Sequence, residues 1–129
     1  MSRTAVHTLI VFLGAGIGAN ARYWSGSLFV TMFPRVSPHW ATVGINVVGS
    51  LLIGVAYALE SHGSMGESWK LLAIVGFLGG FTTFSSFSWE TIRLWQQGAP
   101  GMALLNVAVS NLIAILACWG GYALTRAVA

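Results

Sequence analysis

Charged residues are sparse in this sequence and leave long uncharged stretches between them. Four such stretches, of 18, 24, 19 and 32 residues, lie between the following pairs of charged residues: Arg3 and Arg22, Arg35 and Glu60, Lys70 and Glu90, and Arg93 and Arg126. A helix needs about 20 apolar residues to cross the roughly 30 Å hydrocarbon core of a bilayer. The sequence therefore predicts one all-α transmembrane domain over residues 1–129, with four helices near 5–30, 40–60, 70–96 and 101–125.

The composition supports a membrane protein and argues against two other classes. Only 7% of the residues are charged and the mean hydropathy is +0.77, whereas soluble domains are about 25% charged. The net charge of +3 comes from six basic residues that are spread along the chain and form no patch for nucleic acid. The single cysteine, Cys118, excludes an intrachain disulfide. We expect a lipid bilayer around the protein and no nucleic acid partner.

The basic residues are almost evenly divided between the two sides of the membrane. Four spans place both termini on one side, which then carries Arg3, Lys70 and Arg126, while the other side carries Arg35 and Arg93. The positive-inside rule fixes an orientation only when these charges are unequal. Insertion in both orientations, with an antiparallel homodimer as its product, is therefore open. A single orientation, set by the first helix, is open as well.

A polar run interrupts the third uncharged stretch. Residues 79–90 read GGFTTFSSFSWE, with two adjacent glycines and Thr82–Thr83 in the middle of the expected helix. These residues weaken helix propensity. Non-helical backbone at membrane depth persists only where protein or a wet cavity covers it. We predict a central break in this helix, covered by a second chain. Carbonyls freed by two such breaks would suit a hard cation.

Other polar residues lie at membrane depth and have two interpretations each. Arg22 either snorkels to the interface or faces the bundle interior. Thr42 and Asn46 are four residues apart and share a helix face, as do Asn106 and Ser110. Asparagine at such positions either bonds a neighbouring helix or belongs to a polar track along which an ion moves.

Two aromatic residues follow the expected break. Phe84 and Phe87 are three residues apart and share a face, with serines beside them. Alone, they are typical of packing against lipid or core. Beside hydroxyls, amides and an arginine, and with no acidic residue at mid-depth, their positive ring edges suggest a path for an anion.

At this point the sequence resembles the Fluc/CrcB fluoride channels of microbial membranes, over essentially its whole length. The resemblance is carried by the run at 79–90, by GAGIGANAR ending at Arg22, and by VGINVVGSLLIG around Asn46. It implies a passive, fluoride-selective channel of the bacterial inner membrane that lets fluoride leave the cytoplasm. It also implies an antiparallel dual-topology homodimer with two pores and a structural sodium ion at its centre.

The resemblance also implies roles for individual residues. The backbone carbonyls of Gly79 and Thr82 would bind the sodium ion. The fluoride pathway would be lined by ring edges, an amide, hydroxyls and a basic residue near the entrance, namely Phe84, Phe87, Asn46, Thr42, Ser85, Ser86, Ser110 and Arg22. Glu90 matches the acidic position of the family, with no role assigned. The sequence departs from the family at Ala114, where a serine is frequent, and at Asn106, where an aromatic residue can occur.

Three other classes of protein were weighed against a channel. A dual-topology exporter of the small multidrug type has the same size and helix count but requires a mid-membrane carboxylate, which is missing here. A non-transporting membrane subunit would leave the run at 79–90 without a purpose. An enzyme is the least supported, because the sequence offers no nucleophile with a nearby base, no metal-ligand cluster and no phosphate loop.

Overall fold

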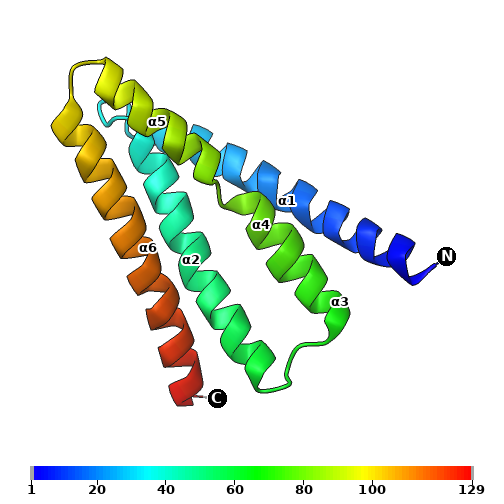
Figure 1. The fold of residues 1–129 in the computed structure, drawn as a ribbon. Helices are drawn as coiled ribbons and strands as arrows, with labels where there is room; N and C mark the ends of the chain where they lie inside the picture. Colours follow the sequence, from blue (N-terminus) through cyan, green and yellow to red (C-terminus); the bar gives the residue numbers. More distant parts are fainter. Residues whose placement is uncertain (1, 129) are drawn as a thin grey trace.

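The computed structural model describes residues 2–128, and all secondary structure in that range is helical (Figure 1). Three membrane-length segments are single helices, α1 (Arg3–Met32), α2 (His39–Ser61) and α6 (Pro100–Val128). The remaining segment, residues 67–96, is divided into α3 (Glu67–Trp69), η1 (Lys70–Leu78), α4 (Gly79–Phe81) and α5 (Phe84–Gln96). All four segments are long and apolar enough to cross a bilayer. The prediction of an all-α, multi-pass membrane protein is confirmed.

The helices form two pairs that are joined near one end of the molecule. Helix α6 packs along α2, while α1 packs along η1 and α4. Helix α5 packs on α6 and α2 and directly follows α4 along the chain, so that it connects the two pairs (Figure 1). The segment η1 is wound more widely than an α-helix, with hydrogen bonds that span five residues. The site described below lies where α5 meets the pairs.

Glycines allow backbones to touch directly within each pair. A Cβ atom added at Gly18 of α1 would collide with the carbonyl of Phe77 in η1, and one added at Gly54 of α2 would collide with the carbonyl of Cys118 in α6. By contrast, a Cβ atom at Gly16 would meet nothing within 4 Å. Small residues have this packing role in membrane helices, where lipid provides no hydrophobic drive for association.

Most of the large apolar side chains point away from the bundle. Phe12 of α1 is 71% exposed and Trp119 of α6 is 68% exposed, whereas the buried residues of α1 are Gly14 and Gly18 alone among those described. An exposed apolar surface of this extent would not persist in water. In a membrane protein, lipid covers such a surface.

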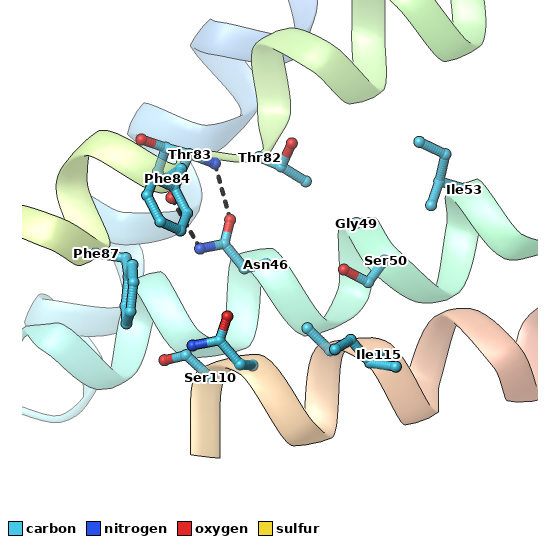
Figure 2. Close-up of a pocket in the computed structure, with 12 residues that line it drawn as sticks. Asn46, Gly49, Ser50, Ile53, Thr82, Thr83, Phe84, Phe87, Ser110 and Ile115 are labelled. Atoms are coloured by element: carbon cyan, nitrogen blue, oxygen red, sulfur yellow. Dashed lines mark hydrogen bonds between the residues drawn. The ribbon is translucent and has the colours of Figure 1, made fainter. Parts of the chain in front are cut away.

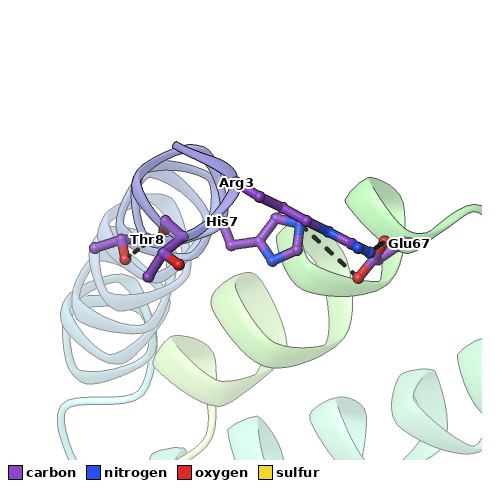
Figure 3. A network of polar contacts seen from close by, with 5 residues as sticks. Arg3, His7, Thr8 and Glu67 are labelled. Carbon is purple, nitrogen blue, oxygen red and sulfur yellow. Dashed lines mark hydrogen bonds and ion pairs between the residues drawn. The ribbon is translucent and has the colours of Figure 1, made fainter. Parts of the chain in front are cut away.

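Ion pairs lie at the end of the molecule that carries the N-terminus and the α2–α3 connection. The Arg3 Nη2 atom lies 2.6 Å from Oε2 of Glu67, and His7 Nε2 lies 3.8 Å from Oε1 of the same residue (Figure 3). Lys70 pairs with Glu60 across the loop. Exposed pairs of this kind contribute little to stability. The contacts of Glu67 join the start of α1 to the start of the third span, and the pair of Lys70 and Glu60 joins the end of α2 to it.

Candidate functional site

The third span is interrupted at Thr82 and Thr83. Helix α4 ends at Phe81 and α5 begins at Phe84, and the two threonines between them have extended backbones, with φ/ψ of −79°/156° and −150°/118°. The Thr83 hydroxyl accepts a hydrogen bond of 3.2 Å from the Ser86 amide and so caps α5. The interruption lies within the polar run 79–90, at membrane depth.

Asn46 of α2 satisfies the exposed backbone of Thr83. Its Nδ2 atom donates to the Thr83 carbonyl at 2.9 Å, and its Oδ1 atom accepts from the Thr83 amide at 2.8 Å (Figure 2). The two bonds replace the helical partners that Thr83 lacks. Asn46 is therefore an interhelical bonding residue. Because an amide nitrogen carries two hydrogens, it keeps a second N–H group for another acceptor.

The break changes the partners of two further carbonyl groups. In a continuous α-helix the Thr83 amide would bond the carbonyl of Gly79, but here it bonds Asn46. The Thr82 carbonyl accepts a long hydrogen bond, 3.4 Å, from Nη1 of Arg22. Arg22 therefore reaches the break instead of snorkelling away from it. The two carbonyls to which the family resemblance assigns the sodium ion, those of Gly79 and Thr82, both belong to this part of the chain.

A cavity of about 260 Å³ lies between α2, the break, α5 and α6. We call it the Asn46 cavity, and Figure 2 shows Asn46, Phe84, Phe87 and Ser110 around it. Phe84 is 74% exposed, whereas Phe87 is buried. Their ring centroids are 5.2 Å apart and the ring planes are tilted by 52°. None of the described residues lining this cavity is charged.

A second, wider cavity of about 610 Å³ lies on the other side of the break, between α1, α2 and α5. We call it the Arg22 cavity, and Thr42, Ser86 and Glu90 also line it. The Thr42 hydroxyl donates to Oε1 of Glu90 at 2.7 Å. The other carboxyl oxygen of Glu90 is buried with no hydrogen-bond partner among the described residues. This cavity therefore contains basic and acidic groups together.

The residues expected to line one pathway are thus divided between two cavities. The Asn46 cavity is lined by Asn46, Phe84, Phe87 and Ser110. The Arg22 cavity is lined by Arg22, Thr42 and Ser86. Ser85 is exposed, with its hydroxyl 3.2 Å from that of Thr83.

Sequence reasoning missed Thr83, the residue that lines both cavities. Two signals were present. A threonine just before the serine-rich start of a helical segment is a favoured N-cap. It also directly follows Thr82, for which a role had been inferred. What the sequence could not reveal is that an asparagine 37 positions away bonds its backbone.

Comparison with known proteins places the chain in a family. Residues 9–122 match the family model described as CrcB-like protein, Camphor Resistance (CrcB). A protein named fluoride-specific ion channel FluC from Novosphingobium aromaticivorans is 43% identical over 123 residues, which cover 95% of this chain and 98% of the relative. Proteins of the same name from Coxiella burnetii and Methylocella silvestris are 38% and 39% identical over 123 residues, covering 94% and 93% of this chain and 98% and 93% of those relatives. With its four spans and its interrupted third helix, this chain belongs to the CrcB-like family.

Proposed function

We propose that this protein is a passive, fluoride-selective channel that lets fluoride leave the cytoplasm. The observation that carries the proposal is the Asn46 cavity, where a free amide N–H and two phenylalanine rings meet at membrane depth without a charged residue. Relatives of nearly the same length are named fluoride-specific ion channels. The cavity and the names of the relatives both support a channel rather than an enzyme.

The chemistry of the Asn46 cavity suits a small anion that has lost its water. Removing an ion from water is costly unless other groups replace its hydration shell. The second N–H group of Asn46 can donate to an anion, and the edges of the Phe84 and Phe87 rings carry partial positive charge. Neutral donors and ring edges of this kind require close contact, which favours fluoride over the larger chloride.

Ions would enter by way of the Arg22 cavity. The guanidinium of Arg22 attracts anions to this side of the break, and the Ser86 hydroxyl accepts from Thr83 at 3.2 Å, which leaves its own hydrogen free to donate. Thr42 and Ser85 stay candidate pathway residues through their hydroxyl oxygens. Thr83, which lines both cavities, would be the point at which an ion passes between them.

We further propose that two copies assemble as an antiparallel homodimer with one pore associated with each copy. The nearly equal distribution of basic residues supports insertion in both orientations. The exposure of Phe84 supports a second chain beside the break, because a single copy leaves this ring uncovered. In such a dimer the two breaks would lie close to each other.

A sodium ion at the dimer centre fits these residues. The carbonyl of Gly79 has lost its α-helical partner to Asn46, and the carbonyl of Thr82 has only a long bond to Arg22. Carbonyl oxygens are suitable ligands for a hard cation. The bound ion would supply positive charge at the centre of the dimer. The nearby guanidinium opposes this cation, so we expect Arg22 to lower its affinity.

A proton-coupled exporter is the second candidate, and one observation favours it. Glu90 lines the Arg22 cavity and has a buried, unpaired carboxyl oxygen, which is a group that coupled transport could use. The two candidates differ in their need for a proton gradient.

The test is ion release from liposomes that contain the purified protein and no other protein. The liposomes are loaded with fluoride or with chloride. Release is then followed without a proton gradient and with a potassium ionophore that dissipates the voltage. Fast fluoride release with little chloride release is expected, and protein-free liposomes are the control. Release that requires a proton gradient would favour the exporter. No release of either ion from folded protein would refute the channel and point to a subunit that needs a partner.

A further inference from the structure

A buried hydrogen-bond chain lies behind the wall of the Asn46 cavity. Asn106 of α6 is only 1% exposed, and its Nδ2 atom lies 2.9 Å from the Thr91 hydroxyl on α5. The hydroxyl of Ser110, which lines the cavity, lies 3.3 Å from Oδ1 of Asn106. The Thr91 hydroxyl lies 2.8 Å from the Phe87 carbonyl. The chain thus connects Ser110 to the backbone of Phe87.

The direction of every bond in this chain follows from its last member. The Phe87 carbonyl can only accept, so the single hydroxyl hydrogen of Thr91 points to it. The Thr91 oxygen can then only accept, which orients the NH₂ group of Asn106 toward Thr91. The amide oxygen of Asn106 consequently faces Ser110, and Ser110 must donate its hydrogen to it.

Ser110 therefore presents oxygen lone pairs, and not its hydrogen, to the Asn46 cavity. Lone pairs repel an anion, whereas a hydroxyl hydrogen would bind it. Two polar residues of the cavity thus differ in what they offer an anion. Asn46 has one N–H group that makes no hydrogen bond within the part of the chain that the structure describes. The hydroxyl hydrogen of Ser110 is already used in its bond to Asn106.

We propose that Asn106 is a positioning residue that keeps Ser110 from binding the permeating anion. It does so by holding the Ser110 hydrogen on the side away from the cavity. The inference rests on the proposed function and refines it: the Asn46 cavity offers the anion the amide of Asn46 and the phenylalanine edges, and its affinity stays low enough for the anion to leave. Conduction requires a site that binds an ion and also releases it.

The test removes the amide and asks whether the effect passes through Ser110. In Asn106→Leu the Ser110 hydrogen is released and can donate to fluoride. One additional hydrogen bond lowers the half-saturating fluoride concentration for release from liposomes by about threefold to tenfold. In the Ser110→Ala background, Asn106→Leu has no such effect. Asn20→Leu is the matched control, because it makes the same substitution at an exposed asparagine whose amide bonds only the Gly16 carbonyl of its own helix, and it keeps the half-saturating concentration of the wild type.

Two results would overturn the assignment. The first is an equal shift for Asn106→Leu with and without the Ser110 hydroxyl, and the second is no shift in a folded Asn106→Leu protein. Asn106→Ala, which removes the amide with a smaller side chain, repeats the test if the leucine does not fit. If neither variant folds while Asn20→Leu does, Asn106 serves assembly and not the positioning of Ser110.

A readout without fluoride separates this inference from the proposed function. Loss of the Ser110 hydroxyl leaves Oδ1 of Asn106 buried and unpaired, so Ser110→Ala lowers the unfolding midpoint in detergent. The decrease is smaller in the Asn106→Leu background, because the unpaired oxygen is then absent. Additive decreases would refute the hydrogen-bond chain. An absence of fluoride release from the wild type would refute the channel and leave this result standing.

Discussion

The two cavities on either side of Thr83 differ in the kind of polarity they contain. The Asn46 cavity is lined without charge by the amides of Asn46 and Asn111, by hydroxyls and by two aromatic rings, whereas the Arg22 cavity contains both a guanidinium and a carboxyl group. Charge attracts ions from a distance but discriminates poorly among them. Neutral donors discriminate through close contact, because they must replace the water around the ion. Under the proposed function, the comparison would place collection of ions on one side of the break and selection on the other.

Removing the Asn46 side chain is expected to have the largest effect. Asn46→Leu leaves the amide and the carbonyl of Thr83 without partners, and each buried unpaired group costs about 1–3 kcal/mol. We expect a marked decrease in the unfolding midpoint and a loss of fluoride release of about a hundredfold or more, because the donor and the shape of the break are lost together. Asn20→Leu is the control, since its exposed amide bonds only Gly16 of the same helix.

Asn46→Asp separates these two effects. It keeps an oxygen for the Thr83 amide but loses the donor and places negative charge on the selective side. The rate of fluoride release should fall by a large factor, whereas the unfolding midpoint should change much less. Unchanged release would remove Asn46 from the pathway and would erase the proposed difference between the cavities.

The phenylalanines should follow with smaller and separable effects. Phe84→Ile and Phe87→Ile each remove a ring edge, and we expect fluoride release to fall by about tenfold in both. Phe87 is buried, so its replacement also lowers stability by about 1–2 kcal/mol. Phe84 is exposed within one copy and its replacement should leave the monomer fold intact. Release assays measure the fluoride flux, and size-exclusion chromatography measures whether the dimer persists. If the dimer is lost while the flux per remaining dimer is unchanged, the two rings are packing residues.

The smallest effect is expected on the collecting side. Arg22→Gln removes a positive charge and retains an amide that can donate toward the Thr82 carbonyl. Fluoride release should fall by about twofold to fivefold at low ionic strength, and by less when an impermeant salt screens the charge. Arg22→Lys, which keeps the charge, should retain most of the rate. An equal loss at every ionic strength would show that Arg22 acts through the geometry of the break and not through its charge.

The spans could be predicted from the sequence because the requirement for about 20 apolar residues leaves a direct pattern in the positions of the charges. The threonines of the break were likewise visible as weak helix formers. The partners were not, because Arg22 meets Thr82 across 60 positions and Asn46 meets Thr83 across 37. Such contacts depend on how the helices pack. The wide winding of η1 was also not expected, since an apolar run of this kind is compatible with an ordinary helix.

The spacing of Asn106 and Ser110 shows what a helical pattern does and does not contain. Four residues apart, they were expected to share a face, and their side chains do form a hydrogen bond. Spacing cannot show which of two polar groups donates. That information came from Thr91, which lies on a different helix and whose own hydrogen is committed to a carbonyl.

The glycine contact between α1 and η1 has a consequence for how the protein works over time. The two backbones lie so close at Gly14 and Gly18 that a Cβ atom at either would collide with a carbonyl of η1, and we expect such close packing to resist movement of η1 against α1. Alternating access requires one part of a transporter to rock against another, and a seam of this kind resists that movement next to the break. A pore with such a fixed wall needs no conformational cycle for each ion. Its throughput is then set by how quickly an ion exchanges one set of donors for the next.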